Sequence, residues 1–101
     1  KYDTSTWYAE SRSNEGDPDI RVYLSTDVPV GLPASFVVVP PVDSNYISPL
    51  SETTTTVFGK YDDVPNAYFG NAVNDNGEWT IIIRFTVGGC TKDLTVESPV
   101  D

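Results

Sequence analysis

Alternation of apolar and polar residues is clearest near the C-terminal end of the chain. In residues 78–87 every odd-numbered position is apolar, and every even-numbered position except Ile82 is polar. Because successive side chains of a β-strand point to opposite faces, this pattern predicts a strand with one buried face. Gly88 and Gly89 follow at once, and glycine accepts the positive φ angles of a two-residue hairpin turn. Residues 90–97 are therefore predicted to return as an antiparallel strand.

The two-residue turn also fixes which residues of this hairpin face each other. The predicted pairs are Val87 with Cys90, Arg84 with Asp93, Ile83 with Leu94 and Ile81 with Val96. Opposite charges then meet on the outer face and apolar side chains on the inner face, and each such pair contributes about 0.2–1 kcal/mol. A register shifted by one residue would lose both agreements.

Five segments upstream also have the pattern of strands, whereas no window of eleven residues has the apolar spacing of a helix. The predicted strands cover residues 6–10, 20–24, 35–39, 53–58 and 67–73. Eight prolines and seven glycines divide the chain into short segments joined by turns. About seven strands in 101 residues predict an all-β, antiparallel two-sheet sandwich with Greek-key connections. A small antiparallel barrel is the alternative.

The length predicts a single domain over residues 1–101, with no internal repeat and with residues 98–101 as a tail or linker. Six basic and fifteen acidic residues give a net charge of −9. This charge repels nucleic-acid phosphates and anionic lipid heads, so we expect no nucleic-acid partner. The apolar runs are too short for membrane insertion. Abundant Thr, Ser, Asn and Asp with few Lys favour a secreted or cell-surface protein.

The residue types exclude most catalytic centres. The sequence has no His, which excludes Ser-His-Asp and Cys-His arrangements and imidazole metal sites. Cys90 is the one cysteine, so it forms no intrachain disulfide, and we expect it to be a small buried apolar residue. Most acidic residues lie in turns, where they are solvated rather than paired in a cleft. We therefore expect no enzymatic activity.

Calcium is the one cofactor that the residue pattern allows. Carboxylates clustered on loops suit this ion. The candidate ligands are Asp17, Asp19, Asp62, Asp63 and Asp75. An EF-hand register that uses Gly77 fails, because it puts Ala72 and Ile83 at ligand positions. The alternative is that these aspartates form turns through their own side chains.

Aromatic residues outside the predicted apolar stripes are candidates for ligand binding. Exposed aromatic rings stack on sugar rings or anchor protein interfaces. The candidates are Trp7, Tyr8, Tyr23, Tyr46, Tyr61 and Tyr68. Trp7 and Tyr8 are neighbours, so in a strand one of them points outward. The alternative is that most of these rings lie at the edge of the core. Trp79 belongs to a buried stripe and is predicted to be core.

Residues 76–97 resemble the final hairpin of bacterial immunoglobulin-like domains. In those domains a Gly-x-Trp or Gly-x-Tyr opens the penultimate strand, and a tight turn leads into a last strand rich in Thr and Val. Gly77 and Trp79 match the opening, and Leu94, Thr95 and Val96 match the close. The resemblance implies an immunoglobulin-like sandwich used on a cell surface or in secretion, and it supplies no functional residues.

Three functions remain open at this point, and protein or polysaccharide is the expected partner. The leading hypothesis is a non-enzymatic, extracytoplasmic immunoglobulin-like module for adhesion, assembly or spacing. The first alternative is a small carbohydrate-binding domain that uses exposed aromatic rings. The second is a hydrolase inhibitor that presents a rigid loop, either residues 29–33 or residues 62–65.

Overall fold

The structure is a computed structural model that describes residues 3–12, 20–42, 50–61, 63–69 and 77–100. The described residues form eight β-strands and no helix, and so contain no helix that could cross a membrane. The strands are β1 (Ala9–Arg12), β2 (Ile20–Leu24), β3 (Pro33–Val39), β4 (Leu50–Thr56), β5 (Phe58–Tyr61), β6 (Val64–Phe69), β7 (Gly77–Val87) and β8 (Cys90–Val100).

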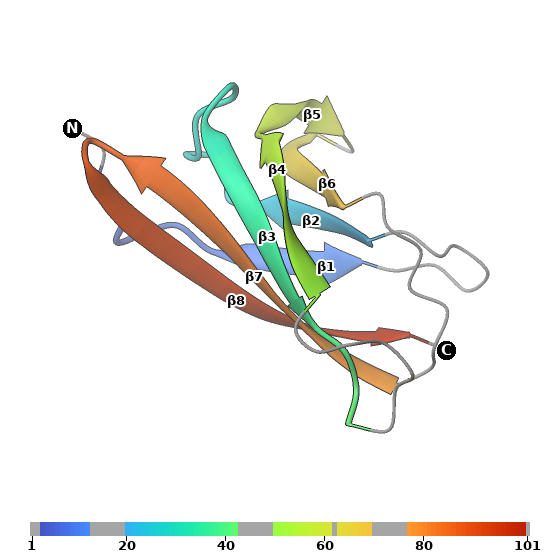
Figure 1. Cartoon of the computed structure of the whole chain (residues 1–101). Coiled ribbons are helices and arrows are strands. Elements are labelled where there is room, and N and C mark those ends of the chain that lie inside the picture. The colour runs from blue at the N-terminus through green and yellow to red at the C-terminus, as the bar shows by residue number, and fades with distance from the viewer. Residues whose placement is uncertain (1–2, 13–19, 43–49, 62, 70–76, 101) are drawn as a thin grey trace.

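The strands form two antiparallel sheets of four strands each (Figure 1). One sheet has the order β1-β2-β6-β5 and the other the order β4-β3-β7-β8. The predicted arrangement of two antiparallel sheets is thereby confirmed, and the alternative of one closed barrel is wrong. The sheets are separate because the described strands at their edges, β1 and β5 in one sheet and β4 and β8 in the other, do not hydrogen-bond across to the other sheet.

The hydrophobic core lies between the two sheets. Phe36 of β3 faces Phe69 of β6, with ring centroids 5.6 Å apart. Trp7 packs edge-on against Phe85 of β7 at 5.3 Å. The largest fully buried side chains come from both sheets and include Trp79, Phe36, Phe69, Phe85, Ile20, Leu24, Ile81 and Ile83. Every odd-numbered residue of β7 from Trp79 to Val87 is buried, so the predicted apolar stripe is confirmed.

The β7–β8 hairpin has the predicted register, with all four predicted pairs present. It is longer than predicted, because Gly77 pairs with Val100. The prediction that residues 98–101 are a tail is therefore wrong for residues 98–100. Cys90 is exposed, which contradicts its predicted burial. It directly follows the Gly88–Gly89 turn, at the end of the hairpin and on the edge strand β8.

The Arg84–Asp93 pair on the outer face of this hairpin makes a pH-dependent contribution to stability. Arg84 Nε donates to Asp93 Oδ1 at 2.9 Å, and this hydrogen bond lowers the pKa of Asp93 below its ordinary value of 3.8. A carboxyl whose folded pKa is lowered stabilises the fold above its unfolded pKa, and this contribution is lost as the pH falls through the folded pKa.

We expect Asp93→Asn to lower the free energy of unfolding by at most about 1 kcal/mol at pH 7, because both side chains are 41% exposed to screening solvent. Urea unfolding of both proteins at pH 7 and again below the lowered pKa measures this difference. We expect the difference to shrink at the acidic pH. An equal difference at both pH values would contradict the ion-pair explanation.

Residues 53–58 do not form one strand as predicted. The chain leaves one sheet after Thr56 and enters the other at Phe58, as β4 and β5. Val57 lies at this crossing with its side chain 1% exposed. Its backbone N–H donates to Leu32 O at 2.9 Å, and its carbonyl accepts from Gly31 N at 2.7 Å. Burial of Val57 and these two bonds hold the chain between the layers.

Two other strand predictions had the wrong bounds. The predicted strand 67–73 begins at Val64, and its residues 70–73 lie outside the described part of the chain. Pro65 is tolerated there because the ladder with β2 begins only at Asn66, and the ladder with β5 is irregular at this point. The first strand covers Ala9–Arg12 rather than residues 6–10. The strands 20–24 and 35–39 were predicted to within two residues.

Candidate functional site

Tyrosines gather on the outer face of the β1-β2-β6-β5 sheet. Arg21 and Tyr23 alternate with Ile20, Val22 and Leu24, which belong to the core cluster, and therefore lie on the opposite face of the sheet. Arg21 is opposite Tyr68 of β6, and Tyr23 is opposite Glu10 of β1, so all four lie on one face. We define the aromatic face as Tyr8, Glu10, Arg21, Tyr23, Tyr61, Asn66 and Tyr68.

Arg21 holds the centre of the aromatic face together. Its guanidinium carbon lies 4.4 Å from the ring centroid of Tyr61 and 4.8 Å from that of Tyr68. Its Nη1 donates to Asn66 Oδ1 at 2.5 Å, and Asn66 Nδ2 donates to the carbonyl of Gly59 at 2.8 Å. Asn66 is 1% exposed, so these bonds satisfy a buried polar side chain. The arginine and the two rings are thus fixed before any partner arrives.

Tyr8 is positioned by the backbone at the start of β1. Its N–H donates to Ser25 Oγ at 3.1 Å, and its carbonyl accepts from Ser25 N at 3.0 Å. The Thr6 hydroxyl donates to the Asp27 carboxylate. This hydrogen bond, and a second one from Ser25, lower the pKa of Asp27. The segment that precedes Tyr8 is therefore anchored to the turn after β2, and the Tyr8 ring is presented from a fixed backbone.

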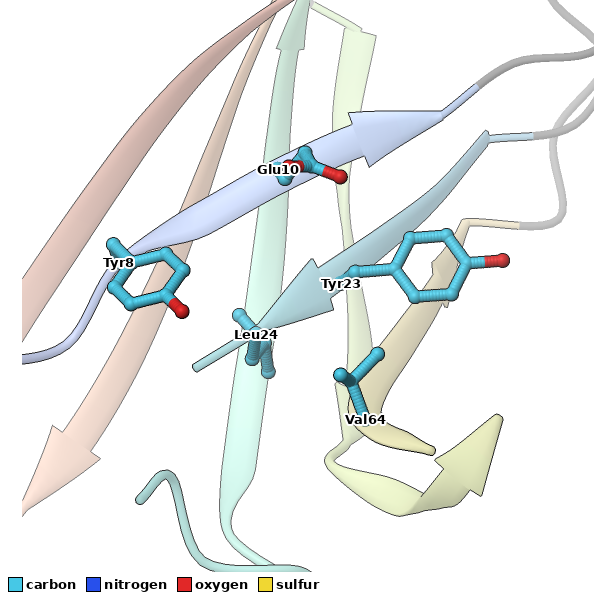
Figure 2. Close-up of a pocket in the computed structure, with 5 residues that line it drawn as sticks. All are labelled: Tyr8, Glu10, Tyr23, Leu24 and Val64. Carbon is cyan, nitrogen blue, oxygen red and sulfur yellow. The ribbon is translucent and has the colours of Figure 1, made fainter. Parts of the chain in front are cut away.

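A shallow depression of about 100 Å³ lies beside Tyr8 on the aromatic face. It is lined by Tyr8, Glu10, Tyr23, Leu24 and Val64. Figure 2 shows Tyr8 and Tyr23 on two sides, with Glu10 above them on β1 and with Leu24 and Val64 below. Pockets for drug-sized ligands measure roughly 300–1,000 Å³, so this depression suits a single small group.

The structure places the six predicted aromatic candidates differently. Tyr8, Tyr61 and Tyr68 are exposed, at 64%, 51% and 36%. Trp7 is buried in the core, so the outward member of the Trp7–Tyr8 pair is Tyr8. Tyr23 is 8% exposed, so its ring is largely covered. Tyr46 lies outside the described residues.

The rings of Tyr23 and Tyr61 do not make a flat platform for sugars. Tyr23 and Tyr61 are neighbours, with centroids 6.1 Å apart, but their planes are tilted by 40°. The Arg21 guanidinium covers one face each of Tyr61 and Tyr68. Stacking on a sugar chain needs open and roughly parallel ring faces, which Tyr23 and Tyr61 do not offer together.

The predicted calcium ligands fall mostly outside the described residues, which omit Asp17, Asp19, Asp62 and Asp75. Asp63 is described and exposed, and its φ of 67° puts it in the turn between β5 and β6. Within the described ranges no three acidic or cysteine side chains gather closely enough to hold a metal ion.

Of the two loops predicted to act as an inhibitor loop, only residues 29–33 form an exposed turn within the described part of the chain. Residues 29–33 form an exposed turn whose tip, Val30, is 59% exposed and whose base is hydrogen-bonded to Val57. In residues 62–65, by contrast, Val64 and Pro65 belong to β6, and Pro65 is buried. The described residues 63–65 of this segment are therefore a turn and the start of β6.

Three members of the site, Arg21, Glu10 and Asn66, were not predicted from the sequence. Arg21 shares the polar face of its strand with Tyr23, and this shared face was the available signal. The sequence held no such signal for Asn66, because Asn66 lies outside the strand predicted to begin at residue 67. Comparisons of the chain with protein-family models, with curated proteins and with solved structures gave no match.

Proposed function

We propose that this chain is a non-enzymatic, secreted or cell-surface immunoglobulin-like module for adhesion or assembly, and that it binds a protein partner through the aromatic face. The observation that carries the proposal is the fixed cluster of Arg21 with Tyr61 and Tyr68, beside the exposed Tyr8.

The strand order supports the immunoglobulin-like part of the proposal. Immunoglobulin domains have strands A, B, E and D in one sheet and strands C, F and G in the other, and variable-type domains add strands beside C. The order β1-β2-β6-β5 corresponds to A-B-E-D, and β3-β7-β8 corresponds to C-F-G with β4 added beside C. The domain would differ from antibody domains in lacking the inter-sheet disulfide, because Cys90 is its one cysteine.

The chemistry of the aromatic face supports a protein partner. Tyrosine and arginine are enriched in protein interfaces and among the residues that contribute most to binding. Binding costs conformational entropy for each side chain that becomes ordered, and rigid side chains reduce this cost. Arg21 is already held by Asn66 and by two rings, so little further ordering is needed. The absence of His from the sequence supports a non-enzymatic role.

A binding screen with matched variants tests the proposal. Labelled protein is applied to an array of extracellular proteins and soluble polysaccharides, as wild type and as the variant Tyr8→Ser/Tyr61→Ser/Tyr68→Ser. All three rings are exposed, so the variant should fold. We expect the wild type to bind at least one protein on the array and the variant to lose that signal, because the interface loses its anchor residues.

The matched control changes three exposed residues on the outer face of the other sheet, as Thr86→Ala/Thr91→Ala/Thr95→Ala. We expect this control to bind like the wild type. Three outcomes would contradict the proposal: polysaccharide binding alone, equal binding by the wild type and the aromatic-face variant, and no binding to any member of the array.

A further inference from the structure

We propose that the depression beside Tyr8 receives the guanidinium of an arginine side chain from the protein partner. This inference rests on the proposed function of the aromatic face and goes beyond it by naming the group that is recognised. The depression is lined by Tyr8, Glu10, Tyr23, Leu24 and Val64.

The lining matches the chemistry of a guanidinium. Tyrosine rings attract cations through their electron-rich faces, and a carboxylate accepts hydrogen bonds from guanidinium N–H groups. Tyr8 supplies an exposed ring and Glu10 a carboxylate from the same segment of the chain, while the largely covered Tyr23 closes the opposite side (Figure 2). Leu24 and Val64 add an apolar surface for the methylene groups of the incoming side chain.

The size of the depression also fits one such group. Its volume of about 100 Å³ is well below the roughly 300–1,000 Å³ of pockets for drug-sized ligands. A depression of this size suits one small group such as a planar guanidinium. Arginine suits the site better than lysine, because a guanidinium is more weakly hydrated and stacks on aromatic rings.

The chain already contains the same kind of recognition a short distance away. The Arg21 guanidinium lies over the rings of Tyr61 and Tyr68 on the same face. Arg21 does not line the depression, and its hydrogen bond to Asn66 holds it in place. Its charge opposes a second cation nearby, whereas the net charge of −9 attracts a basic partner over a longer range.

Titration with small probes tests the inference without knowledge of the partner. Tyrosine-labelled protein is titrated with n-propylguanidinium, n-butylammonium or 1-butanol, and the ring resonances of Tyr8 are followed by NMR. We expect a saturable shift with n-propylguanidinium and binding at least about fivefold weaker for the neutral alcohol, because the alcohol lacks cation–π attraction. n-Butylammonium is expected to bind between the two.

Two variants locate the interaction. Glu10→Gln keeps the shape of the side chain but removes its charge, and we expect it to weaken n-propylguanidinium binding several-fold. Glu78→Gln is the matched control, because Glu78 is an exposed glutamate on β7 of the other sheet, and it should leave the binding unchanged. Tyr8→Leu keeps an apolar side chain at the site and should remove the preference for the cation over the alcohol.

Several results would overturn the inference. No saturable shift, or equal binding of n-propylguanidinium and 1-butanol, would mean that the depression does not select a cation. Tighter binding of n-butylammonium would assign the site to lysine instead. If n-propylguanidinium does not bind but the array shows protein binding, this inference alone is contradicted. If n-propylguanidinium binds saturably but the array shows no protein binding, the proposed function is contradicted instead.

Discussion

Replacement of Phe36 by alanine is expected to lower the free energy of unfolding by about 3–5 kcal/mol. The Phe36 side chain is fully buried and faces Phe69 across the two sheets. Its removal therefore loses apolar burial and leaves a cavity at the point where the layers meet. A domain of this size has a total stability of roughly 5–15 kcal/mol, so the loss is a large part of it. Urea unfolding, followed by tryptophan fluorescence, measures the change.

Phe58→Ala is the matched control for this prediction. It removes the same atoms from a side chain that is 46% exposed, so we expect a loss of less than about 1 kcal/mol. Similar losses in both variants would contradict the assignment of Phe36 to a core shared by the two sheets.

The second large effect is expected at Gly77, which has a φ of 130°. Residues other than glycine are strained in this region by roughly 1–3 kcal/mol. An added Cβ would also lie 2.9 Å from Cγ of Pro41. We expect Gly77→Ala to lower the free energy of unfolding by about 2–4 kcal/mol, the strain and the steric contact together. Thermal and urea unfolding of the purified variant measure the loss.

Gly59→Ala provides the control at a position without either constraint. An added Cβ there meets no atom within 4 Å, and the φ angle is not in the positive range. Alanine also restricts the unfolded chain, so we expect no loss or a slight gain in stability. A loss at Gly59 as large as that at Gly77 would contradict the backbone explanation.

The β7–β8 hairpin could be predicted in detail because residues close together in the sequence determine its faces and its register. Alternation fixed its faces, and the Gly88–Gly89 turn fixed its register, so the Arg84–Asp93 pair was found from the sequence alone. Its extension to Val100 was missed because Pro99 signals a strand end. An edge strand tolerates proline, since one side of it has no ladder to complete.

The pairing of the remaining strands could not be predicted, since it depends on contacts between distant parts of the chain. The run of threonines before Phe58 has one continuous β pattern, and nothing local shows that it changes sheets at Val57. The change becomes evident only from the burial of Val57 and from its two backbone bonds to residues 31 and 32.

The candidate site was predicted in part. Tyr8, Tyr23, Tyr61 and Tyr68 were named from the sequence, and the structure brings these four together. Their common face follows from the pairing of β2 with β1 and β6, which the sequence does not show. Arg21 and Asn66 were missed for the same reason, because their roles arise only when β2, β5 and β6 lie side by side.

The affinity of the aromatic-face variant for a single protein ligand tests the central claim most directly. Dissociation constants for a ligand found on the array are measured for the wild type, the Tyr8/Tyr61/Tyr68 serine variant and the Thr86/Thr91/Thr95 alanine control. Residues that anchor an interface contribute about 2 kcal/mol or more, so we expect the serine variant to bind at least about thirtyfold more weakly. The control should match the wild type. Equal affinity of the serine variant and the wild type, or a loss confined to the threonine control, would contradict the assignment of binding to the aromatic face.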